Sequence, residues 1–198
     1  MSPAKRYSVA AGLGLVVVGV LAFPYVQAQL RPIKPTPSPT PDSVLTNGSL
    51  KLGAPNHLSI PVLGIEAPII YIDDKNETAY QSALKNGVVH YPGTALPGET
   101  GNVYIFGHSS DYVWSDGDYK TIFAKLPQIE MGTDIVVTDA GGNFFHYSVT
   151  ETKVVGPRDM TVLDQGDGSR SLLTIQTSYP LGTALQRYIV VAELSDRE

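Results

Sequence analysis

The chain of 198 residues contains no cysteine. Disulfide bonds, thiolate metal ligands and thiol nucleophiles are therefore excluded. Positive charge is also sparse, because 14 Lys and Arg side chains stand against 19 Asp and Glu, for a net charge of −5. Since the basic residues form no cluster, the composition argues against nucleic-acid binding and against electrostatic docking to anionic lipid.

Charge is almost absent from the N-terminal segment. After Lys5 and Arg6, the stretch from Val9 to Ala28 is uncharged and mostly apolar. A helix of about 20 such residues would span a bilayer, and the basic flank predicts a cytoplasmic N-terminus. We therefore expect residues 1–30 to form a cytoplasmic tip and a single transmembrane anchor, with the rest of the chain outside. A cleaved signal peptide ending at Ala28 is the alternative.

A predicted linker follows, over residues 31–56. It contains five prolines between Pro32 and Pro41, alternating mainly with Thr and Ser. Such a segment cannot pack a core and favours an extended, semi-stiff spacer. We expect it to hold one folded domain, residues 57–198, away from the membrane.

The remaining residues consist mainly of short apolar runs separated by Gly, Pro, Asn and Asp. These runs predict strands over residues 58–64, 67–73, 102–107, 133–139, 143–155, 171–178 and 187–194. Two helices are predicted, over 77–87 and 118–126, with Asp118 as the N-cap of the second. Seven to eight strands at this density predict an all-β fold, a closed barrel or a sandwich with two short helices.

The segment TIQTSYPLGTALQRYIV, residues 174 to 190, combines a nucleophile with a cation. Two apolar runs joined by a turn-rich segment predict neighbouring antiparallel strands. Ser178 ends the first strand and Arg187 begins the second, so both side chains are expected at the same end of the sheet. A guanidinium beside a nucleophile can stabilise charge that develops on a carbonyl oxygen. A hairpin with a polar turn explains the same pattern without chemistry.

The segment IFGHSS, residues 105 to 110, places a histidine directly after an apolar strand. His108 is then held by the sheet and reachable from solvent, so it can act as a general acid or base near neutral pH. A structural role is the alternative for a lone histidine at a strand end.

Taken together, GVVHYPGTALPGETGNVYIFGHSS and LLTIQTSYPLGTALQRYIV resemble the sortases, membrane-anchored transpeptidases of bacterial surfaces. The resemblance covers nearly all of residues 57–194 and implies a sortase-type β-barrel. It implies catalytic roles for Ser178, His108 and Arg187, and it assigns Thr177 to the threonine before the nucleophile. It also implies cleavage of an LPxTG-like sorting signal between Thr and Gly, and transfer to an amine of a peptidoglycan precursor or a pilin lysine. The expected location is then the bacterial cell membrane.

Ser178 departs from the family, which has cysteine at this position. Even an unperturbed thiol is a few per cent thiolate at pH 7, whereas a serine must lose its proton to a well-placed base during attack. Three interpretations stay open: an engineered inactivating replacement, a natural non-catalytic binding module, or a working serine acyltransferase. Asp111, Asp116 and Asp118 follow His108 closely, but they fit a solvated loop and a helix cap.

Thr177, His90 and Trp114 are expected to bind the substrate. His90 and Trp114 lie in or near the family-like segments and are expected to line the cleft, with an ordinary structural role as the alternative for each. The remaining histidines have no partners at zinc-ligand spacing. Asp73, Asp74 and Glu77 fit an acidic turn better than a calcium site. We therefore expect no metal and no cofactor.

Overall fold

The computed structural model describes residues 54–111 and 116–197, and this part of the chain forms a closed barrel. Its eight strands are β1 (His57–Ile60), β2 (Ile65–Tyr71), β3 (Val88–His90), β4 (Gly101–Phe106), β5 (Asp134–Thr138), β6 (Phe144–Val155), β7 (Ser171–Tyr179) and β8 (Gln186–Arg197). Around the barrel their order is β1-β2-β3-β4-β7-β8-β6-β5, and β5 closes the ring by pairing with β1. The predicted all-β barrel is therefore confirmed.

The strands form a barrel because their side chains alternate between a buried and a more exposed face. In β2, Ile65, Ala67 and Ile69 are buried, and the residues between them are partly exposed. The buried apolar side chains of the strands share one interior, apart from Val89, Tyr104, Val136 and Ile189, and Tyr147 is the largest fully buried side chain there. Burying one large apolar side chain stabilises the fold by about 1.5–3 kcal/mol.

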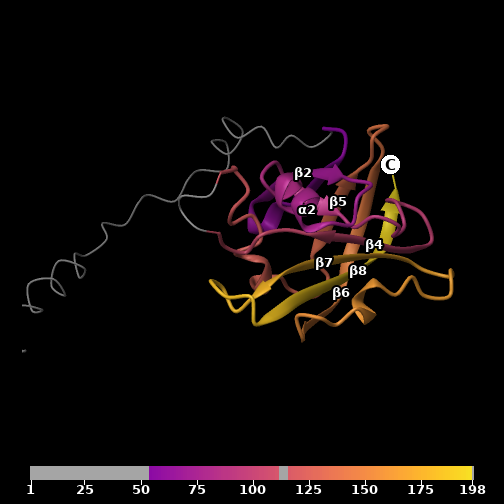
Figure 1. The fold of residues 1–198 in the computed structure, drawn as a ribbon. Helices are drawn as coiled ribbons and strands as arrows, with labels where there is room; N and C mark the ends of the chain where they lie inside the picture. Colours follow the sequence, from indigo (N-terminus) through magenta and orange to yellow (C-terminus); the bar gives the residue numbers. More distant parts are fainter. Residues whose placement is uncertain (1–53, 112–115, 198) are drawn as a thin grey trace, which may run out of the picture. The chain divides into compact units, whose positions relative to one another are not determined.

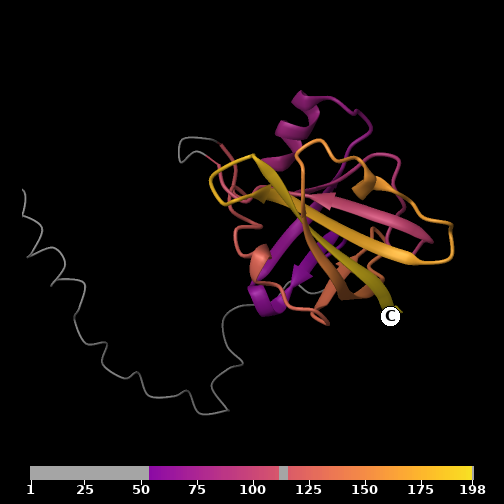
Figure 2. The same ribbon diagram turned by 90° about the horizontal axis from the view of Figure 1, so that it is seen from below.

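Two of the strand pairings are parallel, β2 with β3 and β4 with β7, and the second of these positions the candidate site. β4 and β7 pair from Gly101↔Ser171 to Phe106↔Gln176. Figure 2 shows β4, β7 and β8 side by side. Because parallel strands end at the same edge of a sheet, the segments that follow β4 and β7 come together.

The first predicted helix is present as α2 (Glu77–Leu84), which lies against the barrel (Figure 1). Its N-cap is Asn76, whose side chain accepts a hydrogen bond of 2.8 Å from the Ala79 N–H. Ala83 and Leu84 pack with Val89 on the outer face of β3. The helix ends three residues before the expected stop at Gly87.

The second predicted helix, over 118–126, is wrong. The chain there makes successive turns whose N–H groups bond three residues back, such as Ala124 to Thr121 O, before the short 3-10 helix η3 (Leu126–Gln128). The Phe123 N–H instead donates to the His108 carbonyl, at 3.0 Å. An α-helix would need that donor for its own ladder, so the contact with the strand end excludes it.

Other boundaries also differ from expectation. β3, with three residues, lies outside the seven strand ranges marked by the sequence pattern. The first predicted strand ends at Ile60, because Pro61 has no N–H to donate and begins the 3-10 helix η2 (Pro61–Leu63). The predicted anchor and most of the predicted linker lie outside the described residues. Within 54–111 and 116–197, no helix has the length and apolar character to cross a membrane.

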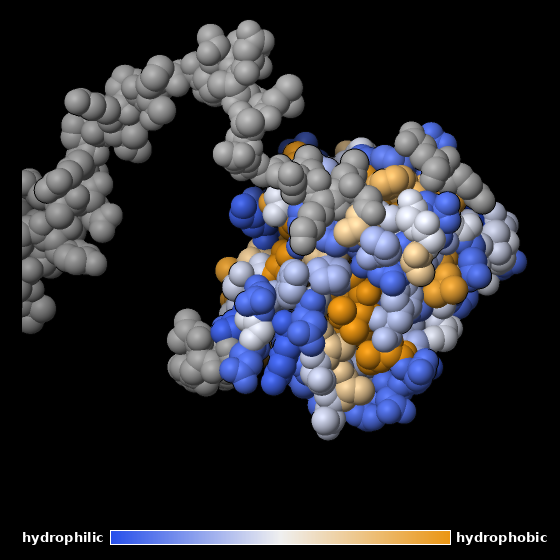
Figure 3. Space-filling model, turned by 90° about the horizontal axis from the view of Figure 1, so that it is seen from above, coloured by the Kyte–Doolittle hydropathy of each residue, from blue (hydrophilic) through white to orange (hydrophobic). Residues whose placement is uncertain are grey.

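One face of the domain shows how the apolar residues are distributed at the surface. In Figure 3, apolar side chains gather in a narrow strip flanked by hydrophilic ones. Large exposed apolar side chains also occur elsewhere, and two of them, Leu181 (61%) and Leu185 (70%), lie in the loop between β7 and β8. This loop borders the candidate site described next.

Candidate active site at the ends of β4, β7 and β8

Ser178 and Arg187 are direct cross-strand partners. β7 and β8 are antiparallel, and Ser178 on β7 pairs with Arg187 on β8. Directly opposed residues share a face of the sheet, with Cβ atoms about 4.5–5.5 Å apart. Both residues are half-buried. The hairpin therefore brings the hydroxyl and the cation together at one edge, as the sequence pattern indicated.

The Arg187 guanidinium is held by the backbone of its own loop. Its Nη1 donates to Ala184 O at 3.0 Å and to Gln186 O at 2.9 Å. Among the described residues it forms no ion pair with a carboxylate. Burial raises the pKa of Tyr104, and the positive charge of Arg187 opposes that rise. A guanidinium without a carboxylate partner can serve an oxyanion.

His108 follows β4, and its backbone is fixed from two sides. The Gly107 N–H donates to Gln176 O at 3.2 Å, which continues the parallel pairing beyond Phe106. Thr177 Oγ1 donates to Gly107 O at 2.9 Å, and the Phe123 N–H donates to His108 O. Extending the register by two residues puts His108 beside Ser178. Within the described ranges the His108 ring itself makes no hydrogen bond.

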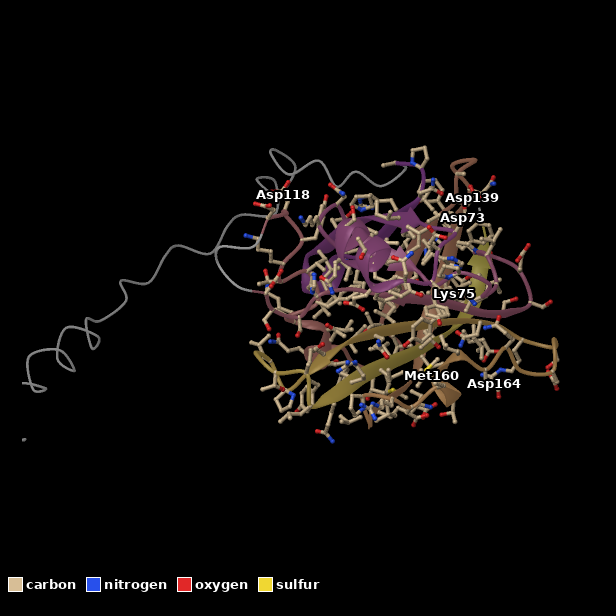
Figure 4. The ribbon with its side chains drawn as sticks, in the orientation of Figure 1. Asp73, Lys75, Asp118, Asp139, Met160 and Asp164 are labelled. Carbon is tan, nitrogen blue, oxygen red and sulfur yellow. The ribbon has the colours of Figure 1, made fainter. Side chains whose placement is uncertain are left out.

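The acidic residues after His108 do not form a carboxylate partner for its ring. Asp116 forms a long ion pair with Lys85, at 3.9 Å, and the Asp118 N–H donates to Lys85 O, so this segment lies against the end of α2. Figure 4 shows Asp118 at the margin of the domain. Asp111 does not lie with Asp116 and Asp118, but lines a cavity next to Ser178.

That cavity has a volume of about 400 Å³ and separates two loops. Its walls are formed by Ser110, Asp111, Ser178, Gly182, Thr183 and Ala184. Ser110 Oγ accepts a hydrogen bond of 3.1 Å from the Gly182 N–H, which ties the loop after β4 to the loop between β7 and β8. Ser178 therefore faces a space that a reacting group can enter.

A second apolar cluster lies on the outer face of the same strands and begins two residues before Ser178, where Ile189 pairs with Gln176. Tyr104 on β4 and Ile189 on β8 are buried there together with Val162 of the loop between β6 and β7, and Phe106 and Leu163 pack around them. Met160 and Asp164 of this loop are visible below β8 in Figure 4. We call this cluster the apolar wall; it lies on the outer face of the sheet beside Ser178.

One side chain, Gln165, holds this wall in place. Its Oε1 accepts from the N–H groups of Ala95 at 3.1 Å and Asn102 at 3.2 Å. Its Nε2 donates to the carbonyls of Asn102 at 3.2 Å and Leu163 at 2.9 Å. Gln165 thereby connects the loop between β6 and β7 with β4 and with the loop before β4.

Two of the three predicted substrate-binding residues, Thr177 and His90, lie apart from the Ser178 face. Thr177 is buried, since its side chain alternates with that of Ser178 and points inward to Gly107. His90 on β3 is 5% exposed, and its Nε2 donates to Ala95 O at 2.8 Å, because a carbonyl can only accept. Burial lowers the pKa of His90. Trp114 lies outside the described residues.

Sequence reasoning missed three side chains that shape the site: Tyr104, Gln165 and Gln176. Gln176 had a usable signal, because it lies two residues before Ser178 in a strand and must share its face. Tyr104 and Gln165 had none, since their roles depend on contacts between distant segments. Groups of three or more His, Asp or Glu side chains suited to a metal ion are absent from the described ranges.

The eight-stranded barrel carries a hydroxyl, a guanidinium and an imidazole at adjacent strand ends, a set of groups that is suited to acyl transfer. Comparison with known proteins identifies the family, since residues 58–195 match the model of the sortase domain. The chain therefore belongs to the sortase family, a family of transpeptidases.

Individual relatives agree with this assignment. Sortase D of Bacillus subtilis (strain 168) is 27% identical over 136 residues, which cover 67% of this chain and 60% of that relative. The solved structure of a Clostridium perfringens sortase D5 transpeptidase is 28% identical, with a TM-score of 0.57 over 71% of this chain and 78% of that one. Sortase C-1 from Actinomyces oris is 27% identical, with a TM-score of 0.59 over 71% and 72%.

Proposed function

We propose that this protein is a sortase-type enzyme that recognises an LPxTG-like sorting signal. Ser178 occupies the nucleophile position, His108 is the acid and base, and Arg187 binds the carbonyl oxygen of the scissile bond. The observation that carries the proposal is the direct pairing of Ser178 with Arg187, with the backbone of His108 next in the same row.

The proposed reaction has two acyl transfers. The side chain at position 178 gives its proton to His108 and attacks the carbonyl carbon between Thr and Gly, while Arg187 donates to the oxygen on which charge develops. The C–N bond then breaks, and the leaving amine takes the proton from His108. In the second step an acceptor amine attacks the acyl carbon, loses a proton to His108 and releases the side chain at 178, which regains that proton.

Two features beside Ser178 suit the two substrates. Phe106 and Leu163, the partly exposed side chains of the apolar wall, suit the leucine and proline of a sorting signal. The cavity on the other side of Ser178 gives an acceptor amine a separate approach. The acceptor in this proposal is a peptidoglycan precursor or a pilin lysine, as the expected roles in surface anchoring or pilus assembly require.

Serine at position 178 limits the rate. A serine hydroxyl needs a base that is already in contact and oriented by a carboxylate. Among the described residues, the His108 ring makes neither contact. We therefore expect the serine form to bind sorting signals and to turn over far more slowly than a cysteine form. The same observation favours the second candidate function, a binding module that keeps the cleft without its thiol.

The proposed setting is the outer face of a bacterial membrane. Its support is the sequence of residues 1–30, where Lys5 and Arg6 precede about 20 uncharged, mostly apolar residues. In this arrangement the linker presents the barrel to sorting-signal proteins at the surface. Cell fractionation followed by protease treatment of intact cells tests it, since a barrel outside the membrane is digested without lysis.

The deciding experiment compares the native chain with its Ser178→Cys variant. Both are incubated with a library of LPxTG-like peptides and an amine acceptor, and the products are followed by mass spectrometry. If only the cysteine form makes product, the site is a sortase cleft that is inactive because oxygen replaces sulfur at position 178. Turnover by the serine form that is lost in His108→Ala identifies a serine acyltransferase. If neither form reacts while peptide binding persists, the binding module is correct and the enzyme assignment fails.

A further inference from the structure

A polar side chain lies between the apolar wall and Ser178. Gln176 on β7 pairs with Phe106 on β4 and with Ile189 on β8, so apolar residues flank it on both sides. It shares the outer face with Ser178 and lies two residues before it, which is about 6–7 Å along the strand. A substrate that reaches Ser178 over this surface therefore passes the Gln176 amide.

The orientation of this amide is fixed by one hydrogen bond. The Tyr104 hydroxyl donates to Gln176 Oε1 at 2.6 Å. Tyr104 is 3% exposed, so its ring cannot easily move, and its ring contacts Tyr91 edge-on with centroids 6.0 Å apart. Burial raises the pKa of this hydroxyl, which therefore stays protonated and able to donate. The acceptor oxygen of Gln176 is thus occupied.

The other end of the amide is open. In the part of the chain that the structure describes, Gln176 Nε2 has no hydrogen-bond partner, and it is not one of the buried unpaired atoms there. It therefore reaches the surface as a donor in an apolar surrounding. A donor held in this way favours ligands with a carbonyl oxygen and disfavours ligands that leave it unpaired.

We propose that Gln176, held by Tyr104, is a polar subsite that donates from Nε2 to a carbonyl oxygen of the substrate peptide. This subsite lies two residues before Ser178, about 6–7 Å along the strand from the position where the scissile carbonyl reacts. This inference rests on the proposed function, since it assigns the subsite to the same peptide. The oxygen belongs either to the peptide backbone or to a Glu or Gln side chain at the variable position of an LPxTG-like signal.

The test is peptide binding to the full chain, followed by NMR of the side-chain amides. LPxTG-like peptides with Glu, Gln, Met or Leu at the variable position are titrated to millimolar concentration. The Gln176 amide signals, assigned by their loss in Gln176→Leu, are expected to shift on binding. Gln176→Leu is expected to weaken binding about tenfold. Tyr104→Phe frees the amide to rotate and is expected to weaken binding by a smaller factor.

A matched control shows whether a loss of binding is specific to position 176 or follows from any Gln→Leu substitution. Gln128 is exposed in η3, so Gln128→Leu makes the same substitution away from the site and should leave binding unchanged. Gln176→Glu replaces the donor with an acceptor and should transfer the preference to a peptide with Lys at the variable position. Unfolding curves of all variants test whether the barrel is intact.

The outcomes separate this inference from the proposed function. An equal loss for all peptides in Gln176→Leu identifies a backbone carbonyl, and a loss confined to the Glu and Gln peptides identifies a side-chain carbonyl. If peptides bind but neither the affinity nor the Gln176 signals change, the subsite is refuted and the sorting-signal cleft stands. If the native chain binds no peptide at millimolar concentration, both the cleft and the subsite are refuted.

Discussion

Phe123 lies directly against Gly107, so closely that a Cβ atom at position 107 would come within 2.8 Å of two ring carbons of Phe123. The backbone N–H of the same phenylalanine binds His108 O. The turn segment around Phe123 therefore supports the strand end that carries His108. A side chain at position 107 would push the two apart.

Gly107→Ala should destabilise the domain by about 1–3 kcal/mol, as overpacking of a filled core does. The reason is the contact with Phe123, together with Val88 Cγ1 at 3.1 Å. Denaturant unfolding measures the change. Gly156→Ala is the control, because a Cβ at Gly156 would meet nothing within 4 Å. Equal stability of the two variants would contradict the prediction.

Thr177→Val should cost about 1 kcal/mol, because it removes the hydroxyl that binds Gly107 O and keeps the size of the side chain. Thr177→Ser retains the hydroxyl and serves as the control. The ring signals of His108 should shift in the valine variant alone, as measured by NMR. Unshifted signals would mean that Thr177 does not position His108.

Arg187→Lys, made in the Ser178→Cys protein, should lower the transfer rate by about 10²–10³ while peptide affinity changes little. A lysine keeps the charge but cannot donate to Ala184 O and Gln186 O while directing a second nitrogen toward the carbonyl oxygen. Single-turnover kinetics with a saturating peptide measures the rate. Full activity of the lysine variant would show that charge alone is sufficient at this position.

Stability should fall as the pH drops below about 6.5, the ordinary pKa of histidine, in part because of His90. Burial lowers the pKa of His90, so the unfolded chain binds a proton in this range and the folded chain does not. Each further drop of one pH unit therefore lowers the free energy of unfolding, until the pH reaches the lowered pKa of His90. His90→Gln keeps a donor for Ala95 O and should reduce this slope. Urea midpoints at pH 7.5 and 5.5 test it, and an unchanged slope would exclude His90.

Gln165→Leu should loosen the apolar wall, since four hydrogen bonds to three segments are lost. We expect a destabilisation of about 2 kcal/mol and faster hydrogen exchange at the Ala95 and Asn102 amides. Gln165→Glu retains the acceptor for both amides and should protect them in part. Exchange rates that match those of the native chain would contradict the role of Gln165.

Much of the fold was predictable from the sequence, because its signals are local. Alternating apolar residues bounded by Gly, Pro and Asn marked seven of the strands, and the short connection between β7 and β8 made them antiparallel neighbours. The opposition of Ser178 and Arg187 follows from that hairpin alone. The prediction of the second helix was wrong because a tertiary contact overrides the local pattern. Phe123 and Leu126 have helical spacing, but the Phe123 N–H binds the His108 carbonyl.

The rest of the site could not be derived from local pattern. His108 comes close to Ser178 only because β4 pairs in parallel with β7, and no local sequence pattern predicts that pairing. The sequence connected the two residues only through the resemblance to sortases. The same limit applies to Gln176, whose free donor depends on Tyr104 from another strand. Roles that depend on two distant segments become visible only when both are placed.

The parallel pairing of β4 with β7 also bears on how the chain folds. Gly107 and Thr177, which this pairing joins, are 70 residues apart in the sequence. Contacts of such long range carry a large loop-closure entropy and form slowly compared with hairpins. The β7–β8 hairpin, with Ser178 and Arg187, can therefore form early, whereas His108 joins them only when the barrel closes. A newly made chain therefore brings Ser178, Arg187 and His108 together only when folding is nearly finished.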